Sequence, residues 1–221
     1  LSIRRQRQMC IRDRENTKFI WVETPSNPLL KIIDIRNVVE IAKGFKIPVI
    51  CDNTFASAYN QRPLELGADI VMNSSTKYLG GHSDLIGGSI ALNKNSTIAE
   101  EIQYLQNAIG SVPSPFDCYL LVRSIKTLSV RMEKHNSNAM QIASFLQNHP
   151  KISKVYYPGL KNSKNHDIAK KQMHGFGGMM SIVLNTDMEG VKKFLKHLSI
   201  FTLAESLGGV ESLIEHPAIM T

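Results

Sequence analysis

The chain has 221 residues, of which 43% are hydrophobic, and a formal net charge of +7. This composition is typical of a globular protein with a sizeable core, and no apolar run reaches the roughly 18 residues that cross a bilayer. Three widely spaced cysteines without a CxxC pair argue against a disulfide framework or a zinc site. We therefore expect a soluble, cytoplasmic protein with free thiols.

Much of the positive charge lies in the leader, residues 1–16 (LSIRRQRQMCIRDREN), which holds five arginines and two acidic residues. The leader has no clean helical or alternating apolar period, and it lacks aromatic residues that would stack on bases. We interpret it as a tail, or as sequence foreign to the fold. A nucleic-acid-binding arm is the alternative, although no binding motif follows the leader.

From Lys18 onward, apolar runs and turn signals predict strands that alternate with helices. Asp34 is expected to cap a helix that Gly44 ends, and 63–66 is expected to form a helical turn. The predicted strands cover 19–24, 47–51, 69–73 and 88–92. Strands separated by helices imply an α/β fold with a mostly parallel sheet and helices on both faces.

After Ser96 the pattern becomes helical and then mixed. It predicts helices over 97–109 and 115–148, the longer one broken or bent along its length. A smaller α+β unit is expected to follow, with strands at 152–156, 179–184 and 200–203 and helices at 167–173 and 188–197. We place a domain boundary near residue 130, between a larger domain (17–130) and a smaller one (131–221).

Two polar clusters follow neighbouring predicted strands, where functional groups of parallel sheets gather. Asp52 ends one strand, and Ser74, Thr76 and Lys77 follow the next. A lysine beside apolar surface and hydroxyl dipoles shifts toward its neutral amine, which forms a Schiff base with an aldehyde. The hydroxyls suit a phosphate, and Asp52 needs a cationic partner such as a protonated pyridine nitrogen. These are the requirements of pyridoxal 5′-phosphate (PLP), and Lys77, once freed by substrate, is placed to move a proton.

These residues lie within a longer series of motifs that runs in order from about residue 17. The motifs are Asp52–Phe55, Ser74–Tyr78, Gly81–Asp84, Ser114–Asp117, Arg123 with Lys126–Leu128, Arg131–Met132, Tyr157–Leu160 and Glu205–Gly209. They resemble the Cys/Met-metabolism family of PLP enzymes, and within it the cystathionine gamma-lyases and gamma-synthases. The resemblance implies a fold-type-I PLP-dependent transferase-like architecture, followed by a truncated smaller α+β domain.

The resemblance also implies roles for individual residues. The residues expected to bind the cofactor are Lys77, Asp52, Ser74, Thr76, Asn27 and Thr54. Lys77 would carry the cofactor and act in catalysis, Asn27 would lie beside the ring, and Thr54 would touch one ring face. Ser206 is expected near the substrate's alpha-carboxylate, and Glu205 near the distal amino group of a cystathionine-like substrate.

The activity that the resemblance implies is a PLP-dependent carbon–sulfur lyase of transsulfuration, which cleaves cystathionine to cysteine, 2-oxobutanoate and ammonia. The alternatives are gamma-replacement on an activated homoserine, as in the gamma-synthases, and a methionine gamma-lyase reaction. The family implies a homotetramer with sites shared between subunits. Because the resembling enzymes are longer at both ends, we expect an internal fragment that does not complete an active site alone.

Two other patterns are weaker indications of a site. His82 and Asp84 supply two metal ligands and no third, so we expect no metal there and instead hydrogen bonds that shape the lysine loop. The segment Gly175–Gly178 is not a GxGxxG motif, because Met180 takes the place of the third glycine and a strand follows. We therefore expect no dinucleotide site of the kind found in NAD-dependent dehydrogenases.

Overall fold

A computed structural model describes residues 16–93 and 97–220. In chain order its elements are β1 (Ile20–Glu23), α2 (Ile35–Lys43), β2 (Val49–Asp52), α3 (Ser57–Asn60), β3 (Ile70–Ser74), η1 (Ser75–Leu79), β4 (Gly88–Leu92), α4 (Thr97–Ile109), α5 (Pro115–Ile125), α6 (Leu128–Leu146), β5 (Ile152–Tyr156), α7 (His166–Gln172), β6 (Ser181–Leu184), α8 (Met188–Lys196), β7 (Thr202–Leu203), β8 (Leu213–Ile214) and α9 (Pro217–Met220). Nearly all of the leader lies outside the described residues, so its interpretation stays a prediction.

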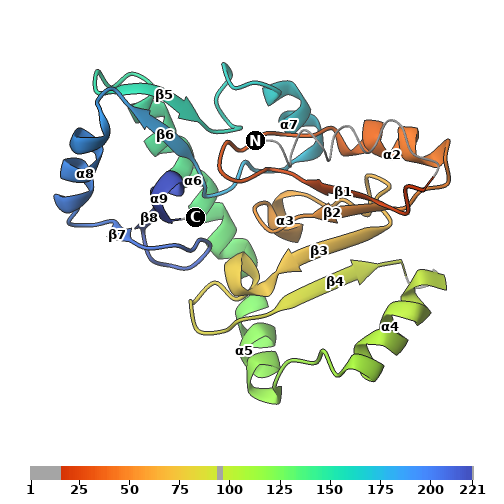
Figure 1. Ribbon diagram of the computed structural model, residues 1–221. Helices are drawn as coiled ribbons and strands as arrows, with labels where there is room; N and C mark the ends of the chain where they lie inside the picture. Colours follow the sequence, from red (N-terminus) through yellow and green to blue (C-terminus); the bar gives the residue numbers. More distant parts are fainter. Residues whose placement is uncertain (1–15, 94–96, 221) are drawn as a thin grey trace.

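The four predicted strands of the first half form one sheet in the order β1-β2-β3-β4. The sheet lies in the centre and right of Figure 1. β1, β2 and β3 are parallel, and in their register Glu23 lies opposite Asp52, and Asp52 opposite Met72. β4 is antiparallel to β3, with Ser74 opposite Gly88. The predicted α/β fold with a mostly parallel sheet is confirmed, and the ends of β2 and β3 meet at one edge.

Helix α2 covers one face of this sheet. Asp34 caps it as predicted, because its Oδ1 accepts from the Asn37 N–H at 3.1 Å, while Gly44 ends it in right-handed rather than left-handed conformation. The core beneath the helix consists of Ile20, Val22, Ile35, Val39, Ala42, Val49, Cys51 and Ala68. On the other face of the sheet Trp21 and Ile90 are 47% and 56% exposed.

The predicted long helix is broken in two, as expected. Ser114 caps α5 by accepting from the Asp117 N–H at 3.1 Å, and the break falls between α5 and α6 at Lys126 and Thr127. Helix α6 then runs from η1 to β5 and contacts both. Residue 130 thus lies inside a helix that joins the two parts of the chain. The domain boundary near that residue remains a prediction. No helix of the described ranges is long and apolar enough to cross a membrane.

The second half forms two small sheets, an antiparallel β5-β6 pair and a parallel β7-β8 pair, with α8 beside them (Figure 1). Tyr157 is fully buried in a second core with Ala139, Ala143 and Leu160. By contrast, α8 has no buried residue. The elements that the sequence did not predict are α3, η1, β8 and α9, each of five residues or fewer. Such short elements show too little periodicity to detect.

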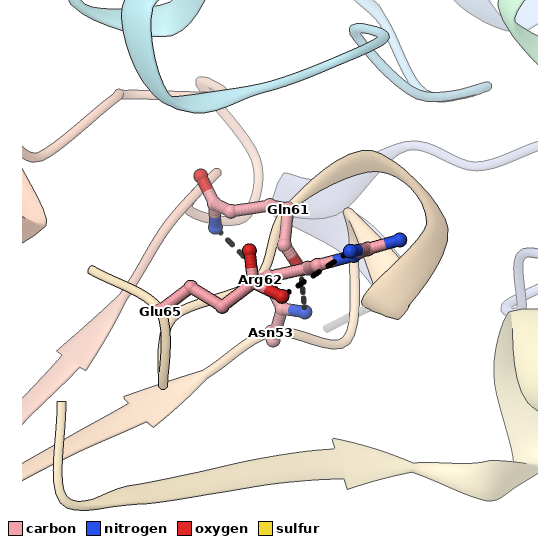
Figure 2. Close-up of polar contacts among 4 residues, drawn as sticks. All are labelled: Asn53, Gln61, Arg62 and Glu65. Carbon is pink, nitrogen blue, oxygen red and sulfur yellow. Dashed lines mark hydrogen bonds and ion pairs between the residues drawn. The ribbon is translucent and has the colours of Figure 1, made fainter. Parts of the chain in front are cut away.

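A buried amide network ties the two halves together. Gln61 Nε2 donates to Asn53 Oδ1 at 2.9 Å, and Asn53 Nδ2 donates back to the Gln61 carbonyl at 2.9 Å (Figure 2). Gln172, at the end of α7, donates to Gln61 Oε1 at 2.9 Å. The exposed Arg62–Glu65 ion pair lies beside this network, with 3.2 Å between its charged atoms. α7 is thus fixed to the loop that follows β2.

Candidate active site

The ends of β2 and β3 bring three predicted site residues together. Asp52, the last residue of β2, accepts from the Thr54 N–H through Oδ1 at 3.0 Å. The Thr54 hydroxyl in turn accepts from the Ser74 N–H at 2.8 Å. Thr54 therefore links the carboxylate of one strand to the main chain of the next, which fixes the spacing of Asp52 and Ser74.

Lys77 lies in η1, a wide helical turn that begins directly after β3. At Lys77 the backbone leaves helical geometry, with φ −92° and ψ −127°. The turn is tied to Gly87, because the Ser75 N–H donates to the Gly87 carbonyl at 2.9 Å and the Thr76 hydroxyl accepts from the Gly87 N–H at 3.0 Å. Wide helical turns of this kind are frequent at functional sites. The lysine is therefore held at the sheet edge by the segment that leads into β4.

A loop from the second half approaches the lysine. The Lys77 Nζ lies 3.5 Å from the Ser206 hydroxyl oxygen, although the two residues are 129 positions apart in sequence. Gly208 has φ +82°, and a Cβ there would lie 2.5 Å from the Tyr78 nitrogen. Only glycine permits so close an approach of two backbones. Glu205, in the same loop, is exposed.

Asn27 lies in the loop that leaves β1. Its N–H donates to Glu23 Oε1 at 2.8 Å, and Glu23 is the neighbour of Asp52 in the sheet register. The loop therefore leaves the same edge of the sheet that carries the other site residues. The contact of Asn27 with a cofactor ring stays a prediction.

Tyr78, next to Lys77, is a residue to which the sequence assigned no role. Its side chain is fully buried, its hydroxyl accepts from the Gly178 N–H at 3.0 Å, and its ring meets that of His135 edge-on at 5.2 Å. Burial raises the pKa of Tyr78 to about 12. The glycine segment that ends at Gly178 therefore supports the lysine turn through a main-chain N–H group.

The expected hydrogen-bonding role of His82 is confirmed. Its Nδ1 lies 2.8 Å from the Gly80 carbonyl and 3.3 Å from the Ser124 hydroxyl, so His82 joins the end of the lysine turn to α5. Asp84 is exposed. Among residues 16–93 and 97–220, no group of three or more His, Cys, Asp or Glu side chains is arranged to hold a metal ion.

The functional groups at this edge fit the chemistry of PLP. Asp52 uses one carboxylate oxygen for the Thr54 N–H, which leaves the other for a ring nitrogen. The Thr76 hydroxyl accepts from Gly87, and its single O–H, now 3.3 Å from the Gly87 carbonyl, is able to turn to a phosphate oxygen. The set provides an amine, a carboxylate and hydroxyl donors, as an aldehyde, a pyridinium and a phosphate require.

Comparison with known proteins gives the site its context. A family model described as "Cys/Met metabolism PLP-dependent enzyme" matches residues 4–221. The chain is 58% identical to cystathionine beta-lyase of Coxiella burnetii over 205 residues, which is 93% of the chain and 53% of that protein. It is 53% identical to cystathionine gamma-lyase of Sus scrofa over 206 residues, covering 93% and 51% of the two chains.

A solved structure agrees with these relatives. Cystathionine gamma synthase from Xanthomonas oryzae pv. oryzae, in complex with cystathionine, superimposes with a TM-score of 0.90 at 46% identity, covering 92% of this chain and 52% of that one. The chain thus spans about half the length of the curated relatives that it matches.

Proposed function

The chain belongs to the PLP-dependent enzymes of Cys/Met metabolism, and on that premise we propose that the complete protein cleaves a carbon–sulfur bond of cystathionine. PLP is its cofactor. The observation that carries the proposal is the approach of Lys77 Nζ to the Ser206 hydroxyl, 3.5 Å, beside the strand ends that hold Asp52 and Ser74. This arrangement sets a candidate proton carrier against a candidate substrate ligand.

Each residue at the sheet edge has a separate task in this proposal. Lys77 holds the PLP aldehyde and later moves the proton of the substrate's alpha carbon, Asp52 pairs with the ring nitrogen, and Ser74 and Thr76 donate to the phosphate. When bound, PLP supplies an electron sink for the carbon that loses its proton. Ser206 contacts the substrate's alpha-carboxylate, where its hydroxyl also faces the lysine amine.

Three further residues complete the proposed site. Asn27 lies beside the ring, at the edge where β1 ends, and Thr54 lies under one ring face while it links Asp52 to Ser74. Glu205, which is exposed in the same loop as Ser206, binds the distal amino group of the substrate.

We propose gamma cleavage, which yields cysteine, 2-oxobutanoate and ammonia, as the reaction, and the 53% identity to the Sus scrofa gamma-lyase supports it. Beta cleavage, which yields homocysteine, pyruvate and ammonia, is a second candidate, and the 58% identity to the Coxiella burnetii beta-lyase favours it. A gamma-synthase reaction is the third, since a gamma synthase is among the similar structures. All three reactions begin with the same proton transfer by Lys77, so the residues at the sheet edge are common to them.

The products separate these reactions. The complete protein, loaded with PLP, is incubated with cystathionine, and both keto acids are measured. We expect 2-oxobutanoate, whereas pyruvate in its place would assign beta cleavage. Neither keto acid, together with turnover of an acylated homoserine plus cysteine, would assign the synthase reaction. No turnover of any of these substrates would refute the proposal.

We also propose that the complete protein is a homo-oligomer. Several large apolar side chains of α4 and α5 are exposed, which is unusual for a monomer surface. They are Tyr104, Leu105, Ile109, Phe116, Tyr119 and Val122. Light scattering after size exclusion tests this proposal: a tetramer is expected, and a monomeric mass would refute it.

A further inference from the structure

Arg131, in the first turn of α6, joins the lysine turn to the break between α5 and α6. Its Nη1 donates to the Tyr78 carbonyl at 2.7 Å. Its Nη2 donates to the Ser124 carbonyl at 3.0 Å, and its Nε donates to the Thr127 hydroxyl at 3.0 Å. One guanidinium therefore connects the Tyr78–Leu79 peptide to Ser124, in the last turn of α5, and to Thr127, which directly precedes α6.

The lysine turn is shaped around this guanidinium. Gly81 has φ +67°, and a Cβ at that position would overlap the guanidinium group of Arg131. The Gly81 N–H also donates to the Lys77 carbonyl at 2.8 Å. The turn thus closes on itself in a conformation that leaves room for an arginine, and glycine is the residue that meets both requirements.

The Arg131 guanidinium donates to two main-chain carbonyls and to the Thr127 hydroxyl, and it pairs with no carboxylate of the described residues. In the described residues the ion pairs are Arg62–Glu65 and Lys192–Glu189, so Arg131 belongs to neither. Burial lowers the pKa of the Arg131 guanidinium, which agrees with a group partly removed from water. A planar fork that reaches two carbonyls in fixed directions orients a backbone, and a lysine ammonium does not reproduce that geometry.

We propose that Arg131 is a positioning residue for Lys77: by fixing the Tyr78 carbonyl it keeps the lysine amine directed at the cofactor site. The inference rests on the proposed function, because it takes Lys77 as the residue that holds PLP. The hydrogen bonds of Arg131 go to Tyr78, Ser124 and Thr127 and not to the lysine amine or Ser206, so we take it to act through the backbone of the turn. The effect of losing it therefore falls on how PLP is held.

The test compares Arg131→Ala with Arg62→Ala in the complete protein, because Arg62 makes only an exposed ion pair. We measure the dissociation constant of PLP and the visible circular dichroism of bound PLP. Loss of these three charge-assisted bonds is expected to weaken PLP binding about tenfold or more and to change the visible signal. A few millimolar guanidinium chloride, too little to unfold the protein, is expected to restore both in part, because guanidinium enters the vacated space. Arg62→Ala is expected to match the wild type throughout.

Three outcomes would overturn the proposed positioning role of Arg131. A folded Arg131→Ala variant with unchanged PLP binding and visible signal would overturn it, as would a weakened variant that guanidinium does not restore. If Arg131→Ala does not fold, Thr127→Val removes the Nε bond, together with the bond that the Thr127 hydroxyl donates to the Ser124 carbonyl at 3.0 Å, and leaves the bond from Nη1 to Tyr78 in place. That variant should weaken PLP binding about threefold, and an unchanged dissociation constant would refute the inference.

A separate result tests the proposed function. If borohydride attaches PLP to a residue of the wild-type protein other than Lys77, the proposed function fails, whatever the Arg131 variants show.

Discussion

The two sides of the candidate site are built in different ways. On the sheet side, Asp52 and Ser74 are the last residues of β2 and β3. Other residues of these strands, such as Cys51 and Val71, are buried. On the other side, Ser206 lies between β7 and β8, two-residue strands without a buried residue. The first side is therefore held by a hydrophobic core, and the second is held by local contacts only.

The contacts between the two sides are few and specific. Gly208 packs on the peptide between Lys77 and Tyr78, and the exposed Ser83 hydroxyl donates to Glu211 Oε2 at 3.0 Å. Such contacts are weak compared with the burial of a core. We infer that the chain fixes the cofactor groups through its fold, and that it leaves the substrate groups on a segment of lower local stability.

Removal of the lysine amine is expected to have the largest effect. Lys77→Ala should eliminate attachment of PLP after borohydride reduction, and it should lower turnover about 10³-fold or more, because the same group moves the proton. Peptide mapping and keto-acid release measure the two effects. Lys43→Ala, an exposed lysine on α2, is the control and should change neither. Label on the Lys77→Ala protein would contradict the assignment.

The difference in core strength is tested by one truncation on each side. Ile35, the first residue of α2, is fully buried, whereas Phe194 on α8 is 38% exposed. Ile35→Ala should lower the free energy of unfolding by about 2–5 kcal/mol, and Phe194→Ala by about 1 kcal/mol or less. Urea unfolding of the complete protein measures both. Equal losses would show that α8 packs against its surroundings as tightly as α2 does.

The charge of Asp52 is tested without changing its shape. Asp52→Asn keeps an oxygen that accepts from the Thr54 N–H, so the link between β2 and β3 should survive. Turnover should nevertheless fall about 10²-fold, since the ring nitrogen loses its anionic partner. A variant that unfolds at the wild-type urea concentration but turns over slowly would support an electrostatic role. Unchanged turnover would exclude that role.

The other side of the site should respond more weakly. Ser206→Ala removes a hydroxyl that lies 3.5 Å from the Lys77 amine. We expect KM to rise about tenfold, with little change in PLP attachment, because the loss of one hydrogen bond to a charged group costs about 1.5–3 kcal/mol. Ser83→Ala, at the exposed contact with Glu211, is the control. A loss of PLP attachment in Ser206→Ala would move Ser206 to the cofactor side.

Local signals explain what the sequence predicted well. The apolar runs give β4 and β5 with the residue ranges observed, and Asp34 caps α2, because strand period and helix caps depend on neighbouring residues. Asp52 and Ser74 were placed at one edge because parallel strands end together. These features need no information from distant parts of the chain.

The long-range contacts could not be predicted from the residues themselves, and only the family resemblance placed Ser206 in the same site as Lys77. Nothing near Lys77 indicates that its amine meets Ser206, because the second half must fold back before the two are close. Arg131 acts on main-chain oxygens of Tyr78 and Ser124, which carry no side-chain signature. The need for glycine at 208 likewise appears only when two backbones are seen side by side. Tertiary geometry, and not residue type, determines these three features.

The buried phenol next to the lysine provides the smallest effect, and one that depends on pH. Tyr78→Phe removes the acceptor of the Gly178 N–H, so the free energy of unfolding at pH 8 should fall by about 1 kcal/mol. Burial raises the pKa of Tyr78 from 10.0 to about 12. As pH rises through this window, the unfolded tyrosine loses a proton that the folded one keeps, so the wild type loses stability that the variant does not.

The gap between wild type and Tyr78→Phe should therefore narrow with pH. At pH 10.5 the expected narrowing is roughly 0.8 kcal/mol, and the other tyrosines cancel because both proteins contain them. Urea unfolding at pH 8 and pH 10.5 measures the gap directly. If it stays constant, the Tyr78 phenol ionises as readily in the folded protein as in the unfolded chain. Such a result would show that the Tyr78 hydroxyl is not shielded from water in the folded protein, and would contradict its buried contact with Gly178.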